Sequence, residues 1–269
     1  MNQLQSYLLA LAQGLFDVLP IGGAVHRWLL PRLLDWPEPS PAADFAVRLG
    51  VLIVIAAYVW RDLFNIAVGV WHILRGRRSP RARQVWPLML PLVPYAAAGV
   101  AVVVYAHGAL VLTPVQIGWS LLGFGFLLWL GDRLGMTVRR IEHLSVGNAL
   151  VVGLLLAASF VPGAGRTATV VTAARWLGYE RPAAARLSLI LSVPVLLAGL
   201  VRRSFELSQM SLPLIAPEPL IAGVAAMIGA GLGITFLMSW IQRRSFAPFA
   251  LYRILAGAGL LTLAYLAAR

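Results

Sequence analysis

Long uninterrupted apolar stretches constrain this chain more than any other feature. A helix needs about 20 predominantly apolar residues to cross the hydrocarbon core of a bilayer. Six segments match that requirement to within a few residues, at 45–61, 86–106, 116–131, 184–201, 218–240 and 249–267. Only 12% of the residues are charged, about half the share that soluble domains carry. We therefore expect an all-α integral membrane protein with six transmembrane helices in a single membrane domain, residues 1–269.

Two further apolar stretches, 3–31 and 147–177, are interrupted by proline and glycine. The interrupting residues are Pro20, Gly22, Gly23, Pro162, Gly163 and Gly165. Irregular backbone is tolerated at membrane depth only inside protein or beside a water-filled cavity. We therefore predict that each stretch is a re-entrant helical hairpin made of two half-helices.

The net charge of +12 comes entirely from arginine, because the chain has no lysine. In a soluble protein such a charge would suggest nucleic acid, but in membrane proteins arginines gather in cytoplasmic loops. The run from Arg75 to Arg83 therefore predicts a cytoplasmic loop that contacts anionic lipid. Alternation from there places both termini on the outer side, with Arg202 and Arg203 as the exception to the rule. We expect a bilayer as partner and no nucleic acid, while a homodimer is compatible with the sequence.

The order of these segments repeats along the chain. Residues 1–137 and 138–269 each contain one hairpin followed by three spans, and an odd number of spans inverts the second half relative to the first. Inverted repeats with broken helices place a site near the membrane midplane, at the interface of the repeats.

The broken helices indicate an anion site. A half-helix that starts after each turn would direct free N–H groups and its positive dipole end into the membrane interior. Glycine allows the backbone to approach an anion closely, and the guanidinium of Arg166 can bind a phosphate bidentately. The candidate phosphate ligands are Gly22, Gly23, Gly163, Gly165 and Thr167.

Three ionisable residues accompany the turns, namely Asp17, His26 and Arg166. Ionisable side chains are costly inside a membrane and are functional candidates by default. Other interpretations are open: Asp17 and Arg166 could form a structural ion pair, and His26 could lie at the membrane interface. Gln13 could support the site or bond within the bundle, and the glycines could simply permit close helix packing.

Two further arginines lie near the ends of spans. For Arg48 and Arg186 we expect snorkelling toward the interface rather than substrate binding.

Two stretches resemble signatures of a known family. Residues 13–26 resemble Q-G-x-T-E-F-L-P-x-S-S-S-G-H, and residues 162–168 resemble P-G-x-S-R-S-G. These are motifs of the bacterial undecaprenyl-diphosphate phosphatases of the bacitracin-resistance type, whose first-span end and last-span start are similar to residues 58–63 and 245–253. The resemblance covers nearly the whole chain in order.

The resemblance implies removal of one phosphate from undecaprenyl diphosphate at a site that opens to the outer face of the bacterial plasma membrane. This reaction recycles the lipid carrier for envelope glycan synthesis. The acidic, histidine and arginine positions of the family fall on Asp17, His26 and Arg166, which the resemblance makes the catalytic residues. It also suggests Mg²⁺ as cofactor, with Asp17 as the ligand.

This chain departs from the family pattern at its hydroxyl groups. The serines of the first motif fall on Gly22, Gly23 and Ala24, and the serine before the arginine falls on Gly165. Thr167 is the hydroxyl that remains in these motifs. Hydrolysis by water would still be open to such a site, with Asp17 or His26 as base and Arg166 on the phosphate. The alternatives are a non-hydrolytic relative that binds or transports a polyprenyl phosphate, and a scaffold of an envelope-synthesis complex.

Overall fold

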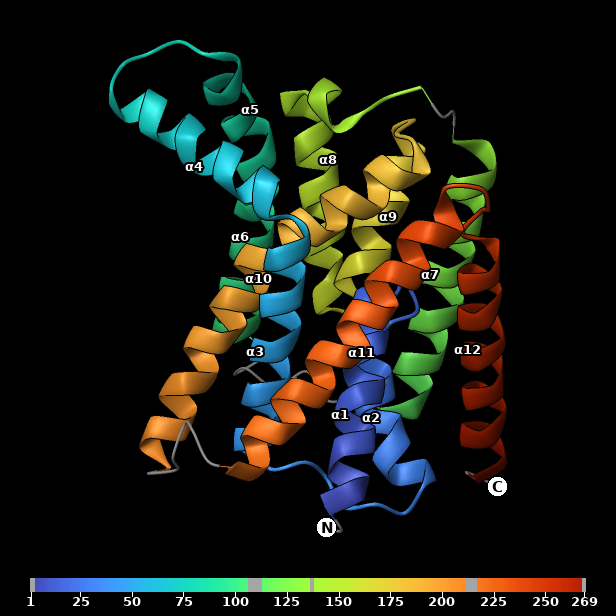
Figure 1. Ribbon diagram of the computed structural model, residues 1–269. Coiled ribbons are helices and arrows are strands. Elements are labelled where there is room, and N and C mark those ends of the chain that lie inside the picture. Colours follow the sequence, from blue (N-terminus) through green and yellow to red (C-terminus); the bar gives the residue numbers. More distant parts are fainter. Residues whose placement is uncertain (1–2, 106–112, 136–137, 211–216, 268–269) are drawn as a thin grey trace.

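The computed structural model describes residues 3–105, 113–135, 138–210 and 217–267. Over these ranges the chain is helical, and the β-structure is confined to an isolated bridge between Arg139 and Tyr179. Figure 1 shows the helices gathered into one bundle, with the N- and C-termini at the same end. An even number of spans requires this placement of the termini.

Within the described ranges, six helical segments are long and apolar enough to cross a membrane, which confirms the predicted number. They are α3 (Pro41–Tyr58), α5 with α6 (Pro80–Met89 and Leu92–Tyr105), α7 (Pro114–Leu134), α10 (Arg181–Gln209), α11 (Pro217–Ile241) and α12 (Ala247–Ala267). Helices α3 and α7 begin with proline directly after a capping Ser40 or Thr113, whose side-chain oxygen accepts a hydrogen bond from a backbone N–H at 3.2 Å. Proline at the first helical position and a hydroxyl before it are the standard start of a helix.

The second span differs from the prediction of one continuous segment at 86–106. It begins earlier, at Pro80, and is broken between Met89 and Leu92 around Pro91. Proline has no N–H to donate, and its ring clashes with the preceding turn, so the helix is interrupted there. The helix α4 (Trp60–Leu74) precedes this span and projects from the end of the bundle opposite the termini (Figure 1).

Each interrupted stretch folds as a pair of short helices. The first pair is α1 (Gln3–Val18) and α2 (Gly23–Leu33), and the second is α8 (Val146–Ala157) and α9 (Arg166–Trp176). Single 3₁₀ turns lie at Ile141–His143 and Ala158–Phe160. Both pairs fit the predicted re-entrant hairpins, and their depth in a bilayer stays a prediction.

The main helix contacts join the two halves of the chain. Helix α7 packs on α12, and α3 packs on α10. In a corresponding way, α1 packs on α11 and α8 packs on α6. Inverted repeats would produce contacts between these corresponding helices. The extensive contact of α3 with α11 departs from this pattern, because among the described residues no comparable contact corresponds to it. The repeat boundaries at 1–137 and 138–269 stay a prediction.

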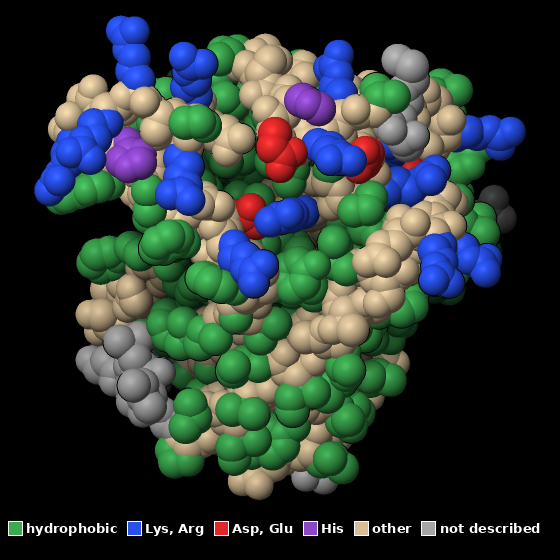
Figure 2. Space-filling view, turned by 45° about the horizontal axis from the view of Figure 1, so that its top comes forward, with side chains coloured by type: hydrophobic (Ala, Val, Ile, Leu, Met, Phe, Trp, Pro, Cys, Tyr) green, Lys and Arg blue, Asp and Glu red, His purple; other side chains and the backbone are tan. Residues whose placement is uncertain are grey.

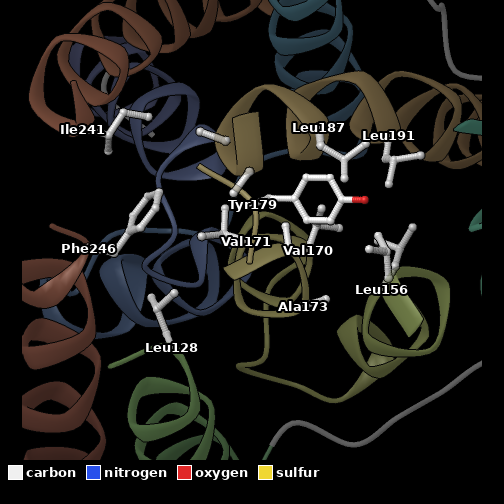
Figure 3. Packing of buried hydrophobic residues seen from close by; sticks show 14 of the residues in the cluster. Leu128, Leu156, Val170, Val171, Ala173, Tyr179, Leu187, Leu191, Ile241 and Phe246 are labelled. Carbon is white, nitrogen blue, oxygen red and sulfur yellow. The ribbon is translucent and has the colours of Figure 1, made fainter. Parts of the chain in front are cut away.

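The core that surrounds α9 fixes its position. Val170, Val171 and Ala173 of this helix are fully buried against Leu187 and Leu191 of α10, as Figure 3 shows. At the far end of the helix, the buried guanidinium of Arg175 donates a 2.9 Å hydrogen bond to Asp132 of α7. Helix α9 is therefore held along its length, and Arg166 projects from a rigid support.

Glycines bring α1 and α11 into direct backbone contact. A methyl group on Gly14 would overlap the carbonyl of Ala226, and one on Gly229 would overlap the carbonyl of Leu11. Small residues that allow such close approach are typical of helix interfaces in membranes.

We expect Gly14→Ala to lower the thermal midpoint of the detergent-solubilised protein by several degrees, because α1 must move away from α11 to admit the methyl group. The measurement is a thermal unfolding scan of purified protein. Gly123→Ala is the matched control, since a methyl group on this α7 glycine meets no atom within 4 Å. An unchanged midpoint for Gly14→Ala would contradict the close packing.

Charge separates the two ends of the molecule. Figure 2 shows arginines spread over the end from which α4 and α5 project, and an apolar surface below them. The residues on the loops and helix ends there include Arg75, Arg77, Arg78, Arg81, Arg83, Arg139, Arg140, Arg243 and Arg244. This is the side that the sequence predicts to be cytoplasmic.

Candidate active site

The two proline–glycine turns meet inside the bundle. Gly22 precedes α2 and Gly165 precedes α9, and both have the positive φ values (86° and 72°) that favour glycine. A methyl group on Gly165 would lie 3.0 Å from the Cα of Gly22, and one on Gly22 would lie 3.1 Å from the carbonyl oxygen of Gly163. The turns therefore touch through their backbones, and the N-terminal ends of α2 and α9 come together at one place.

Asp17 and Arg166 join the two hairpins at this junction. Arg166 Nη2 donates a 3.0 Å hydrogen bond to Asp17 Oδ2, and the two side chains are mostly buried. Thr167 Oγ1 donates to the backbone carbonyl of Asp17 at 3.3 Å. The Nε of Arg166 is buried without a hydrogen-bond partner in the described part of the chain. The hydrogen bond to Asp17 therefore leaves part of the hydrogen-bonding capacity of the guanidinium unused.

A cavity of about 620 Å³ opens beside this pair. It is lined by Asp17 and Arg166 and by all five candidate phosphate ligands (Gly22, Gly23, Gly163, Gly165 and Thr167), whose binding of phosphate stays a prediction. Its volume lies in the usual range for ligand sites. One wall is apolar and comes from α6 and the loop before α9, through Tyr95, Gly99, Val102, Val103 and Phe160. The cavity can thus hold a polar headgroup beside an apolar chain.

His26 lies behind the turn rather than on the wall of this cavity. Its Nδ1 is 3.1 Å from the carbonyl oxygen of Gly22, and its Nε2 is hydrogen-bonded to the hydroxyl of Tyr252 on α12. The ring packs between Phe16 and Tyr252, with centroids 4.6 Å and 5.6 Å away. These contacts hold the Gly22 turn, while an acid–base role for His26 stays a prediction. Gln13 is buried, and together with His26 and Phe16 it lines a small void separate from the cavity.

Tyr252 and Arg253 are site-supporting residues that the sequence reasoning did not single out. Arg253 is fully buried on α12 and donates hydrogen bonds to the carbonyls of Gly163 and Ala164 at 3.0 Å and 2.9 Å. An arginine inside a predicted span is the signal that could have identified it, because such a charge needs a specific partner.

Other arginines lie where the sequence analysis did not place them. Arg48 was expected to snorkel, but it lines the cavity and pairs with Asp44 at 2.9 Å, because its position on α3 faces the bundle interior. Arg202 and Arg203, the exception to the charge rule, line the same cavity. Arg186 lies outside it and binds Asp62 of α4 through two hydrogen bonds of 2.9 Å.

The residues at the junction do not form a metal site by themselves. Among the described residues, no three His, Asp or Glu side chains come close enough together to hold an ion. Mg²⁺ commonly binds through one or two carboxylates and the phosphates of a substrate. Asp17 is the carboxylate beside Arg166, so an ion here would depend on the phosphates of the ligand, and the need for Mg²⁺ stays a prediction.

Comparison with known proteins identifies the family. Residues 6–259 match the family described as bacitracin resistance protein BacA. The chain belongs to the BacA family. It is 41% identical to "Undecaprenyl-diphosphatase 1" of Rhodospirillum rubrum, over 98% of this chain and 95% of that protein. It is also 36% identical to "Undecaprenyl-diphosphatase 1" of Paramagnetospirillum magneticum and 35% identical to "Undecaprenyl-diphosphatase" of Geobacter metallireducens, over at least 97% of each chain.

Membership of the BacA family confirms the resemblance that the two motifs indicate. The match extends from within α1 to within α12, so both glycine turns and their junction belong to the matched region. The names of these relatives do not favour the alternative of a non-hydrolytic binding protein or transporter. The catalytic roles of Asp17, His26 and Arg166 stay predictions. Asp17 and Arg166 line the cavity, whereas His26 lies behind the Gly22 turn.

Proposed function

We propose that this protein is an integral-membrane phosphatase that converts undecaprenyl diphosphate to the monophosphate and so recycles the lipid carrier for envelope glycan synthesis. The observation that carries the proposal is the Asp17–Arg166 pair at the junction of two glycine turns, in a chain of the BacA family. The relatives named undecaprenyl-diphosphatase support it over nearly their full length.

The residues at the junction of the two turns have different roles in the proposed reaction. The free N–H groups at the start of α9 and the guanidinium of Arg166 bind the phosphate oxygens and stabilise the charge that develops as the bridging P–O bond breaks. Asp17 orients a water molecule and accepts its proton as the water oxygen attacks the terminal phosphorus. The products are inorganic phosphate and the lipid monophosphate.

The apolar wall provides a place for the lipid. Tyr95, Val102 and Val103 line the cavity from α6, and the exposed side chains of that helix are apolar. The isoprenoid chain would lie against α6, with its diphosphate directed to the glycine turns.

The charge pattern supports an active site that opens to the outer face of the bacterial plasma membrane. Arginines crowd the end from which α4 and α5 project, and membrane proteins keep such loops in the cytoplasm. The cavity extends from the turns toward the start of α3 and the end of α10, at the end where both termini lie (Figure 1).

The direct test is phosphate release from undecaprenyl diphosphate by the purified protein in detergent, with and without Mg²⁺. The proposal predicts catalytic turnover and little release from the monophosphate. Absence of turnover in folded protein that binds the lipid would contradict it and would favour a carrier.

We expect Thr167→Val to retain activity within about tenfold of the wild type, because the threonine hydroxyl donates to the backbone of Asp17 and water is the nucleophile. The measurement is kcat for phosphate release, beside Thr167→Ser as the matched variant that keeps the hydroxyl. The threonine would instead be the nucleophile if Thr167→Val lost activity, Thr167→Ser retained it and a phosphoprotein could be trapped.

A further inference from the structure

A second group of charged side chains lines the cavity near its mouth. Asp44 of α3 forms ion pairs with Arg27 of α2 at 3.0 Å and with Arg48 of α3 at 2.9 Å, and lies 3.4 Å from Arg203 of α10. We call Arg27, Asp44, Arg48 and Arg203 the mouth cluster. All four line the same cavity as Arg166 but come from other parts of the chain.

Positive charge exceeds negative charge in and around the mouth cluster. Arg203 and its neighbour Arg202 also pair with Glu206 on α10, at 2.6 Å and 2.9 Å. Four arginines therefore share two carboxylates, which leaves two positive charges in excess. Partly buried charge of one sign is unfavourable unless a counter-charge joins it.

Unused hydrogen-bond donors indicate the kind of counter-charge. The Nε atoms of Arg27 and Arg203 are buried, and neither has a hydrogen-bond partner among the residues that the structure describes. A guanidinium donates in a planar fork that matches the oxygens of phosphate. The mouth cluster thus has the excess positive charge that attracts an oxyanion, together with two buried Nε donors that lack a partner.

A purely structural network looks different in the same protein. Around Asp132, Arg175 donates to the carboxylate and also to the carbonyls of Asp132 and Gly135, and the guanidinium is fully buried. The arginines of the mouth cluster are instead about a quarter to a third exposed and face an open cavity.

We propose that the mouth cluster is a second phosphate-binding subsite, separate from the Asp17–Arg166 pair. The inference rests on the proposed phosphatase function and names a further part of its substrate or product path. Its ligand is a phosphate group, either the second phosphate of the lipid headgroup or inorganic phosphate on its way out. Asp44 holds the arginines in position without neutralising them.

The test measures equilibrium binding in protein that cannot turn over. The background is the double variant Asp17→Asn, Arg166→Gln, which replaces the inner ion pair by neutral amides of similar shape. Into it we introduce Arg48→Gln, Arg27→Gln or Asp44→Asn, with Arg186→Gln as the matched control from an ion pair outside the cavity. The probes are inorganic phosphate, farnesyl diphosphate and farnesyl monophosphate.

We expect Arg48→Gln and Arg27→Gln each to weaken binding of at least one probe by about tenfold or more, because each removes charge-assisted hydrogen bonds to phosphate. Asp44→Asn is expected to strengthen the same binding, since it removes a competing carboxylate. A merely structural role would weaken binding in all three variants. Weaker inorganic phosphate binding identifies the free product as the ligand, whereas a loss confined to farnesyl diphosphate identifies the headgroup.

Two results would overturn the subsite. One is unchanged binding of all three probes in both arginine variants, and the other is weaker or unchanged binding in Asp44→Asn. Because no turnover is needed, failure of the phosphatase assay in the wild type would not affect this result, and the two proposals fail separately.

Discussion

Replacing Arg166 with alanine is expected to lower the rate of phosphate release from undecaprenyl diphosphate by about a thousandfold or more. Arg166 is the first residue of α9 and projects into the cavity at the junction of the glycine turns. Arg166 uses Nη2 to hold Asp17, so other donors of the same guanidinium can serve a phosphate oxygen in the cavity. The measurement is kcat/KM of the purified variant beside Arg186→Ala, which breaks an ion pair outside the cavity and should leave the rate unchanged.

A structural ion pair is the competing explanation, and a double variant separates the two. Removing one partner of a buried pair costs about 3–5 kcal/mol of stability because the other charge remains unpaired. The double variant Asp17→Asn, Arg166→Gln removes both charges and should recover most of the thermal stability that Arg166→Ala loses. If the double variant recovers stability but not activity, the ion pair has a catalytic role. If it recovers both, the pair serves only to join the two hairpins.

The main features of the fold could be predicted because they depend on local sequence. Span number follows from apolar length, and the turns follow from proline and glycine, whose backbone constraints act within a few residues. Gly22 and Gly165 have positive φ values for this reason. The same argument failed for the second span, where Pro91 lies inside an apolar stretch that was predicted as continuous.

The surroundings of the site could not be predicted, because they depend on which distant helices meet. The contact of His26 with Tyr252 joins residues 226 positions apart, and nothing near His26 in the sequence indicates that its ring faces α12. Arg48 illustrates the same limit. An arginine seven residues inside a helix can snorkel or face a cavity, and only the packing of α3 against α10 decides between them.

The glycines at the positions where the resembled motif has serines have a physical consequence. Gly22 and Gly165 approach so closely that a methyl group on either would contact the other turn at about 3 Å. This chain therefore offers backbone N–H groups and Arg166 where the motif that it resembles has serine hydroxyl groups. Glycine offers no side-chain nucleophile at these positions, but the backbone N–H groups and Arg166 can still stabilise a phosphate.

Asp17→Asn is expected to lower kcat for phosphate release by about a hundredfold to ten-thousandfold, the usual contribution of a general base. Asparagine has the shape of aspartate and keeps an oxygen that can accept from Arg166, so the junction should stay folded. It cannot accept a proton from water, and it offers no charge to orient the molecule. The measurement is kcat over a range of pH, with thermal unfolding as the check on structure.

Asp17→Glu is the matched variant, because it keeps the carboxylate and restores the acidic residue of the family motif. The Asp17 side chain borders an open cavity, so one more methylene can be accommodated, and we expect activity within about tenfold of the wild type. High activity in Asp17→Glu with little in Asp17→Asn shows that the carboxylate itself is required. Wild-type activity in Asp17→Asn would instead assign the proton transfer elsewhere, and His26 behind the Gly22 turn would then be the first residue to test.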